Sequence, residues 1–363
     1  MRQRLAELRG PDVPPQPLDA RALAALAANP GCRRRALLDG AGVPKAALAE
    51  SLGAPSGFGQ SQFAFMRGHA FEARVKADGG AELLRLTHAR VGGGPEPVPG
   101  GASVPDLSAA GPEGRAARTS LALRDATDAG AWTLLDHPML ALDVAGTLAF
   151  LEPDAVVVAP DGTWTVVEIK SFPMIDGAAD AAKVGAAARQ AAVYVLALEA
   201  VAARLDPAPT VRHRVLLVCP KDFSNLPAAS AVDIRKQLSV TRRQLSRLAR
   251  VEDIAATLPP GTTFDVGRPA AELTAAVDAV PATYAPECLA ACELAFHCRT
   301  RARAAGEVTA LGRSLRADLG ALTTVDEALS ASRGEFGDPR DPAVAALRRA
   351  GELRAEALAG SHG

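Results

Sequence analysis

Two carboxylates and a lysine stand at the ends of neighbouring apolar segments of this chain. Asp154 precedes a run that contains three valines, and Glu168 and Lys170 close the next apolar segment. Acidic side chains supply hard oxygen ligands to a divalent cation, and a nearby lysine can orient or activate a water molecule or stabilise charge on a phosphate. Together, the three residues predict metal-dependent cleavage of a phosphodiester bond.

The segments around these residues predict how they are brought together. The runs 155–159 and 163–167 favour β-strands, and residues 160–162 between them are typical of a turn, so the pair is expected to form a hairpin. Because side chains alternate along a strand, Glu168 and Lys170 should share one face. A Glu-x-Lys pair is more often an exposed charge pair. Within nearly all-apolar strands, however, such charges are costly unless a metal or partner compensates them.

A helix expected after these strands adds two polar side chains. Gln190 and Tyr194 are spaced i, i+4 in an otherwise apolar stretch. Residues with this spacing lie on one face of a helix, so the two side chains should point the same way.

With these motifs in place, the chain resembles the PD-(D/E)xK nucleases, and Gln190-x-x-x-Tyr194 resembles an element of their RecB-like branch. In that branch an upstream helical histidine often completes the metal site. His69, in the context Gly68 to Glu72, matches it, although a lone histidine is more often a surface or capping residue. The resemblance implies a magnesium or manganese site formed by His69, Asp154 and Glu168. It also implies that the catalytic residues are Asp154, Glu168, Lys170, Gln190 and Tyr194.

Five cysteines suggest a second site. Cys288, Cys292 and Cys298 lie close together in the sequence and Cys32 lies far upstream, whereas Cys219 ends an apolar run and is expected to be a core residue. A disulfide framework is not expected in a long chain without a secretory signal. Four thiolates can hold a [4Fe-4S] cluster or a zinc ion, and buried thiols without metal are the third alternative.

The cysteine pattern resembles the iron-sulfur subgroup of RecB-like nucleases, which includes AddB and the RecB-like nuclease of CRISPR adaptation. In that subgroup, one N-terminal cysteine and a C-terminal trio hold a [4Fe-4S] cluster. The resemblance implies the same role for the four cysteines here. This chain has Cys-x3-Cys where the commonest family spacing is Cys-x2-Cys, and zinc remains the alternative metal. The implied ligands are Cys32, Cys288, Cys292 and Cys298.

Composition indicates a globular intracellular protein. Apolar residues make up 48% of the chain and charged residues 22%, which is ordinary globular usage. No continuous apolar run reaches the ~18 to 20 residues of a membrane span, and the N-terminal sequence leads into no hydrophobic signal core. A cytoplasmic location without a membrane partner is therefore expected.

Basic residues are clustered although the formal net charge is only -1. Arg33, Arg34 and Arg35 follow the first cysteine, and three more arginines occur in 299–303, so one metal centre would bring both groups together. A helix predicted from about residue 234 to residue 250 has an apolar stripe and an opposite basic face. Such a face is usually only solvated, and the alternative is contact with DNA phosphates. The basic face consists of Lys236, Arg243, Arg247 and Arg250.

The order of segments predicts an α/β fold with a restriction-endonuclease-like core, in which a mixed sheet is flanked by helices. Residues 1–60 are expected to be helical, 61–304 to contain the nuclease core and the cysteine trio, and 305–363 to form a helical tail without assigned chemistry. Residues 91–114 are rich in Gly, Pro and Ala and are expected to be a flexible insertion. A metal cluster should join the N-terminal and C-terminal helical parts.

The resemblance implies a metal-dependent deoxyribonuclease, more specifically an exonuclease, that acts on single-stranded DNA or DNA ends in repair, recombination or defence against foreign DNA. One alternative is a non-catalytic nucleic-acid-binding or scaffold protein of the same fold. Another is the nuclease subunit of a complex with a separate helicase or defence partner, because this sequence has no Gly-x-x-x-x-Gly-Lys-Ser/Thr nucleotide-binding loop.

Overall fold

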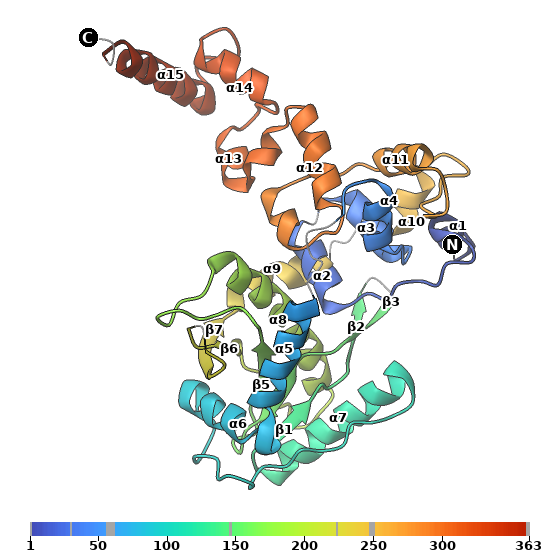
Figure 1. The fold of residues 1–363 in the computed structure, drawn as a ribbon, viewed down its shortest axis with the longest axis vertical. Helices are drawn as coiled ribbons and strands as arrows, with labels where there is room; N and C mark the ends of the chain where they lie inside the picture. The colour runs from blue at the N-terminus through green and yellow to red at the C-terminus, as the bar shows by residue number, and fades with distance from the viewer. Residues whose placement is uncertain are drawn as a thin grey trace.

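A five-stranded mixed sheet forms the centre of the fold (Figure 1). The computed structural model describes residues 2–29, 31–55, 62–144, 147–222, 224–246 and 251–360. Strand order is β1-β4-β5-β6-β7, with β5 and β6 parallel and the other neighbours antiparallel. The strands are β1 (Thr133–Asp136), β4 (Ala155–Val158), β5 (Trp164–Ile169), β6 (Arg214–Pro220) and β7 (Pro227–Asp233), and a separate hairpin contains β2 (Leu140–Val144) and β3 (Thr147–Leu151). The predicted α/β class with a mixed, helix-flanked sheet is confirmed.

The hairpin predicted around the turn at residues 160–162 is present. Ala155 of β4 lies opposite Val167 of β5, and Gly162 in the turn has a φ of 77°. The N–H of Gly162 donates to the carbonyl of Ala159 at 2.9 Å. A glycine is favoured at this position because residues with a Cβ rarely adopt positive φ. This turn places the start of β4 beside the end of β5.

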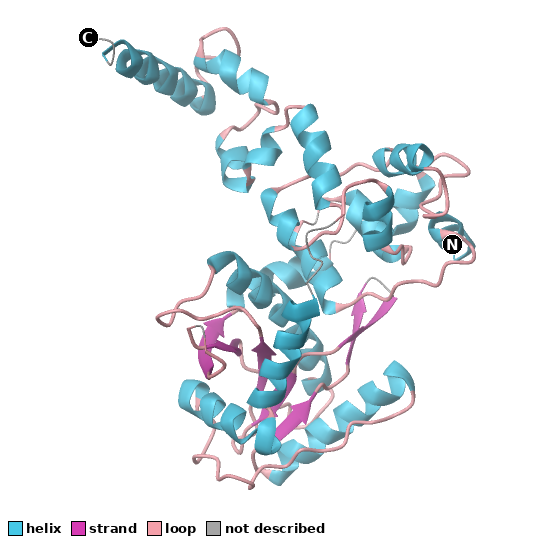
Figure 2. Ribbon diagram, viewed as in Figure 1, coloured by secondary structure: helices cyan, strands magenta, loops and turns pink. Residues whose placement is uncertain are grey.

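Both faces of the sheet are covered, as the apolar strands require (Figure 2). On one face, Val157 and Val167 join a core with Phe71 of α5 (Gln62–Val75) and Leu83 of α6 (Ala77–Val91). On the other face, alternate residues such as Val166 pack with α7 (Gly111–Ala129) and α8 (Ala181–Ala202). Because Glu168 is two residues after Val166, it points toward the α8 side of the sheet.

The long helix α8 lies in the core of this domain. By length and composition it is apolar enough to cross a membrane, and 56% of its most apolar window is buried inside the protein. It contacts β5 and β6 of the sheet as well as α2 (Ala20–Ala28) and α9 (Arg235–Leu245). Its hydrophobicity is thus used for packing within the fold.

The segment expected to be a flexible insertion has little regular structure but several backbone contacts. Ser103 pairs with Thr133 at the edge of the sheet, and the indole N–H of Trp132 donates to the carbonyl of Pro95 at 2.8 Å. Helix α7 begins at Gly111, which lies inside the expected insertion. The irregular segment therefore follows the β1 edge of the sheet.

The N-terminal helices and the helices within residues 251–304 form a separate group beside the sheet (Figure 1). Helix α3 contacts α10, and α4 contacts α11. This group contains α1 (Arg2–Arg9), α2, α3 (Arg33–Gly40), α4 (Lys45–Ser51), α10 (Val251–Ala256), α11 (Ala270–Asp278), the 3-10 helix η1 (Pro286–Ala290) and α12 (Ala295–Ala304). Residues 305–360 have a small core of their own, and their elements are η2 (Val308–Leu311), α13 (Arg313–Asp318), α14 (Val325–Ser332) and α15 (Pro342–Gly360).

Candidate functional site

Asp154, Glu168 and Lys170 come together where β4 starts and β5 ends. The carboxylate of Asp154 accepts hydrogen bonds from the backbone N–H of Ile169 at 2.7 Å and from Nζ of Lys170 at 3.3 Å. Nζ of Lys170 also lies 2.5 Å from Oε2 of Glu168. The lysine ammonium group therefore bridges the two carboxylates, and Glu168 and Lys170 lie on one face as their spacing predicts.

Glu168 is a buried acid, only 1% exposed. Burial raises its pKa to about 7, opposed by Lys170 and reinforced by Asp154. Although Nζ of Lys170 is within ion-pair distance, neither carboxylate oxygen of Glu168 has a hydrogen-bond partner of good geometry among the described residues. Such unsatisfied oxygens are costly in a folded protein. A divalent cation would satisfy them, so this donor set fits Mg²⁺ or Mn²⁺.

Lys170 remains positively charged in this environment. Burial favours its neutral form, but the carboxylates of Glu168 and Asp154 outweigh that effect and raise the pKa of Lys170 above its ordinary value. At neutral pH the ammonium group therefore donates hydrogen bonds and supplies positive charge, and it cannot accept a proton.

Gln190 and Tyr194 contact each other on α8, as their spacing predicts. Nε2 of Gln190 donates to the hydroxyl of Tyr194 at 2.9 Å, and that hydroxyl donates to the carbonyl of Glu152 at 3.0 Å. Burial raises the pKa of Tyr194 well above its ordinary value, and the charges of Glu168 and Asp154 raise it further. The tyrosine thus stays protonated and holds the backbone two residues before Asp154.

His69 is exposed on α5, a helix that passes beside the end of β5. A Cβ atom at the preceding residue, Gly68, would lie 3.9 Å from Cβ of Ser171, which follows Lys170. Within the described residues, no three His, Cys, Asp or Glu side chains are close enough to hold a metal ion. The structure therefore places His69 on a neighbouring element but does not gather it with Asp154 and Glu168 into a compact ligand set.

A charged cluster that the sequence analysis did not select lies directly behind Asp154. Lys76 follows α5, and its Nζ donates to the backbone carbonyl of Asp154 at 2.7 Å. The same Nζ lies 2.5 Å from Oε1 of Glu72 and 2.6 Å from Oδ1 of Asp136. Nε2 of His137 lies 2.9 Å from the same oxygen of Glu72. The largely buried Lys76 thus ties α5 to the start of β4.

Electrostatics stabilise the charged forms in this cluster. Although burial favours neutral Glu72, its contacts with His137 and Lys76 hold its pKa at about 2. The hydrogen bond to Glu72 raises the pKa of His137 against the effect of burial. Two sequence signals could have identified the cluster, namely the i, i+4 pair Glu72 and Lys76 on the helix of His69, and an Asp-His pair directly after an apolar segment.

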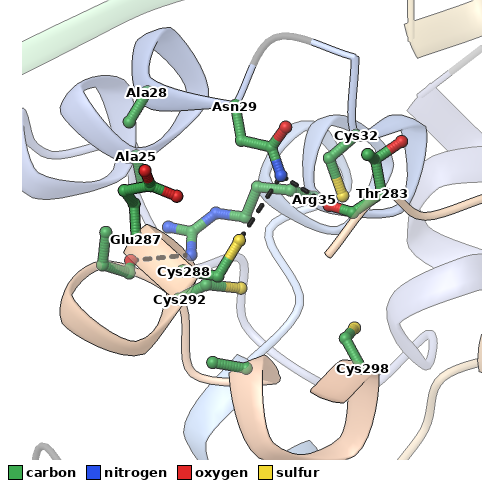
Figure 3. A pocket seen from close by; sticks show the side chains of 12 residues that line it. Ala25, Ala28, Asn29, Cys32, Arg35, Thr283, Glu287, Cys288, Cys292 and Cys298 are labelled. Atoms are coloured by element: carbon green, nitrogen blue, oxygen red, sulfur yellow. Dashed lines mark hydrogen bonds between the residues drawn. The ribbon is translucent and has the colours of Figure 1, made fainter. Parts of the chain in front are cut away.

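The four cysteines grouped by the sequence analysis line one pocket of about 30 Å³ between the N-terminal and C-terminal helices (Figure 3). Cys32 immediately precedes α3, Cys288 lies in η1, Cys292 follows η1 and Cys298 lies in α12. Cys219 is elsewhere, fully buried in β6, as expected for a core residue. No disulfide joins any of the five, all of which lie in the described part of the chain.

Polar side chains approach the sulfur atoms of this pocket. Nδ2 of Asn29 donates to Sγ of Cys288 at 3.4 Å, and Nη1 of Arg34 donates to Sγ of Cys298 at 3.3 Å. Burial raises the pKa of Cys298 to about 12, with Arg34 acting in the opposite direction. As the thiols are not arranged at ligand distances, a metal would have to draw them together. The donor chemistry of four sulfurs in one pocket fits zinc or an iron-sulfur cluster.

The predicted basic helix is present but shorter than expected. Helix α9 ends at Leu245, and its backbone carbonyls are capped by the N–H of Ser246. Lys236 and Arg243 are exposed and two turns apart, so they share one face. The remaining members of the basic face, Arg247 and Arg250, lie outside the described residues.

No protein-family model, curated protein or solved structure matches this chain. The chain has two candidate sites, one built from carboxylates and a lysine and the other from thiols.

Proposed function

We propose that this chain is a metal-dependent DNA nuclease, acting as an exonuclease on single strands or DNA ends, and that its sheet is the restriction-endonuclease-like core of the RecB-like group it resembles. The observation that carries the proposal is the buried carboxylate of Glu168 beside Asp154 and Lys170. Its Oε2 is paired with Nζ of Lys170, and its Oε1 has no hydrogen-bond partner among the described residues. In a structural ion pair, buried carboxylate oxygens are normally hydrogen-bonded. In a cation site, a carboxylate oxygen is available to coordinate the metal ion.

Each residue has a role that follows from its position. Asp154 and Glu168 would hold Mg²⁺ or Mn²⁺, with His69 approaching from α5 as a further ligand. When bound, the cation would polarise the scissile phosphate and generate a nucleophilic hydroxide from water. Lys170 keeps its proton, so it would orient the water or stabilise negative charge on the phosphate. Gln190 and Tyr194 would brace the backbone before Asp154.

The pocket with Cys32, Cys288, Cys292 and Cys298 is proposed to hold a structural [4Fe-4S] cluster, with zinc as the alternative. Its four sulfurs come from Cys32 and from a segment that lies more than 250 residues later in the chain. A metal centre in this pocket would connect the two helical parts. It would be separate from Asp154 and Glu168, the proposed ligands of the catalytic cation.

Cleavage of end-labelled single-stranded and double-stranded DNA by anaerobically purified protein tests the proposed activity. Cleavage should require Mg²⁺ or Mn²⁺, stop with chelator and leave closed circular DNA intact. Glu168→Gln should reduce the rate by at least about 100-fold, because a ligand for transition-state charge stabilisation is lost. Glu82→Gln, which changes an exposed glutamate paired with Arg85, is the matched control. Chelator-resistant cleavage, or a wild-type rate for Glu168→Gln, would refute the assignment, and DNA binding without cleavage would favour a scaffold.

The exposed face of α9 is proposed to contact DNA phosphates. Replacing Lys236 and Arg243 together by alanine should weaken binding for all sequences and make the dependence of log affinity on log salt shallower, since fewer counterions are released. A control double variant, Arg85→Ala with Arg124→Ala, removes two arginines that are paired with neighbouring carboxylates. An unchanged salt slope for the α9 variant would show that this face is only solvated.

A further inference from the structure

Two consecutive arginines of α3 are buried beside the cysteine pocket. Arg34 is 7% exposed and Arg35 is 4% exposed, whereas the preceding Arg33 is exposed. Burying a guanidinium group is costly unless it is hydrogen-bonded and its charge is compensated. The hydrogen-bond and ion-pair partners of Arg34 and Arg35 therefore indicate the role of these side chains.

The contacts of Arg34 connect one sulfur to the backbone and to one carboxylate. Besides Sγ of Cys298, Arg34 donates through Nε to the carbonyl of Val280 at 3.1 Å. Its Nη2 lies 3.6 Å from Oδ1 of Asp278. Asp278 is itself shared, because Nε2 of His297 lies 3.1 Å away and Nη2 of Arg301 lies 2.7 Å away. This carboxylate therefore only partly neutralises Arg34.

Arg35 enters the pocket itself. Its guanidinium group extends among the side chains around Cys288 and Cys292 (Figure 3), and it is one of the residues that line the pocket. Nη1 donates to Oε2 of Glu293 at 2.7 Å and to the carbonyl of Ala291 at 3.2 Å. Nε lies 2.5 Å from Oδ2 of Asp39. Asp39 is shared with Lys45, whose Nζ lies 2.6 Å from Oδ1. The guanidinium group of Arg35 is therefore held by shared carboxylates at the wall of the pocket, next to the turn that carries two of the sulfurs.

We propose that Arg34 and Arg35 are charge partners of a four-thiolate metal centre in this pocket. Four thiolates around a divalent zinc ion, or around an oxidised four-iron core, leave a net charge of about -2. Two guanidinium groups compensate this charge in a place that water does not reach freely. Arg34 donates directly to Sγ of Cys298, and Arg35 lines the pocket together with the four cysteines. Both are therefore positioning residues for the thiolate ligands.

This role rests on the proposed metal centre and is independent of the proposed nuclease activity. Groups that contact metal ligands typically change metal affinity by about 10- to 100-fold when they are mutated. Removing either positive charge should therefore weaken binding. In the iron-sulfur case it should also lower the reduction potential, because the more negative reduced cluster loses a compensating charge.

The test compares three neighbouring arginines by titration of metal-free protein with Zn²⁺ in competition with a chromophoric chelator. Arg34→Gln and Arg35→Gln should each weaken Zn²⁺ binding by about 10- to 100-fold. Arg33→Gln, at an exposed position of the same helix turn, should bind like the wild type. Arg34→Lys should recover part of the affinity, since it restores the charge without the fork geometry. Iron content and reduction potential of anaerobically prepared protein provide a second readout.

Melting curves of the metal-free variants separate folding from binding. Because Arg35 is also paired with Asp39 and Glu293, its variant can unfold, and Arg34→Gln then decides the question. Zn²⁺ affinity and iron content equal to wild type in a folded Arg34→Gln would overturn the proposal. A wild-type protein that binds neither zinc nor iron would overturn it together with the metal centre, whereas loss of DNA cleavage alone would count only against the nuclease assignment.

Discussion

The protonation state of Glu168 links this side chain to folding stability. Its pKa of about 7 in the folded protein lies above its ordinary value of 4.5. Between these pH values the unfolded chain has lost the proton and the folded protein keeps it, so stability falls as pH rises from about 4.5 to about 7. Glu72, with a pKa of about 2, contributes stability that is lost only below about pH 4.5. The two effects therefore occupy different pH windows.

Replacing Glu168 by glutamine should remove this pH dependence. In chelator-containing buffer, wild-type protein should lose about 3 kcal/mol more unfolding free energy between pH 4.5 and 8 than Glu168→Gln does. Because His137 titrates in both proteins, the difference between them isolates Glu168. Urea unfolding at several pH values measures it. Parallel pH profiles for the two proteins would mean that Glu168 is ionised throughout this range.

Lys76 should affect the rate of cleavage although its ammonium group contacts the backbone of Asp154 and not the proposed cation. Its Nζ holds the carbonyl of Asp154, so Lys76→Met should shift Asp154 and lower kcat by about 10- to 100-fold, a loss of roughly 1 to 3 kcal/mol of positioning. KM should change little. Arg74→Gln, at an exposed position on α5, is the control, and Lys76→Arg should restore part of the activity. A purely structural role would lower the melting temperature and leave kcat of the folded protein unchanged.

Residues that are close in the sequence could be predicted to form a site, whereas contacts between distant segments could not. Asp154, Glu168 and Lys170 converge because one hairpin connects them, and the sequence contains that hairpin. Local patterns mark two pairs of the Lys76 cluster, Glu72 with Lys76 and Asp136 with His137. The contact between these pairs is tertiary, so sequence spacing does not predict that they meet. The three consecutive arginines after Cys32 look like a basic surface, but Arg34 and Arg35 are buried by segments more than 240 residues away in the chain.

A kink in the first turn of α6, directly after Lys76, is an element-scale feature that positions this lysine. Three consecutive residues, Asp78, Gly79 and Gly80, have positive φ, so the chain turns sharply after Lys76. A Cβ atom at Gly80 would lie 2.2 Å from Cδ2 of Leu134 in β1, whereas nothing lies within 4 Å of one at Gly79. Both positions therefore favour glycine because of their positive φ. Gly80 is also in close contact with Leu134, whereas Gly79 is not.

Gly80→Ala should destabilise the protein more than Gly79→Ala. Both variants carry the cost of a Cβ at positive φ, about 1 kcal/mol. Gly80→Ala must also displace the buried side chain of Leu134 to relieve the contact with its Cδ2, which adds roughly 1 to 3 kcal/mol. Chemical unfolding of both variants measures the difference. Equal losses of stability would show that the contact with Leu134 relaxes without cost.

At the level of elements, sequence patterns located β4 and β5 and did not predict β1 and β7. The apolar runs of β4 and β5 were predicted because buried strands are continuous hydrophobic segments. Strand β7 was not predicted because its residues Pro227–Asp233 are small and half-buried. Strand β1 was not predicted because it is short and follows a glycine-rich stretch. The amphipathic pattern from 234 to 250 predicted α9, whose last residue is Leu245, and residues 247–250 lie outside the described part of the chain.

Hydrogen bonds between protein groups connect the N-terminal helices to the segment 264–283. The N–H of Arg34 donates to the carbonyl of Pro281 at 2.9 Å, and Nδ2 of Asn29 donates to the carbonyl of Thr283 at 2.6 Å. The N–H of Phe264 donates to the carbonyl of Leu8 at 2.7 Å. Closing so long a loop opposes folding through lost chain entropy, although this cost grows slowly with length. A metal bound by four thiolates would add its binding free energy at this same junction.

Two cysteine variants should separate metal binding from core packing. Cys298→Ala should abolish stoichiometric metal binding and the rise in melting temperature that metal gives the wild type, because binding to the folded state adds directly to stability. Cys219→Ser should keep the metal but lose about 1 to 3 kcal/mol of stability, since its hydroxyl would be buried in β6 among apolar side chains. Elemental analysis and thermal unfolding of anaerobic and chelator-treated samples measure both effects. Full metal content in Cys298→Ala, or loss of metal in Cys219→Ser, would show that the sulfurs of this pocket are not the ligands.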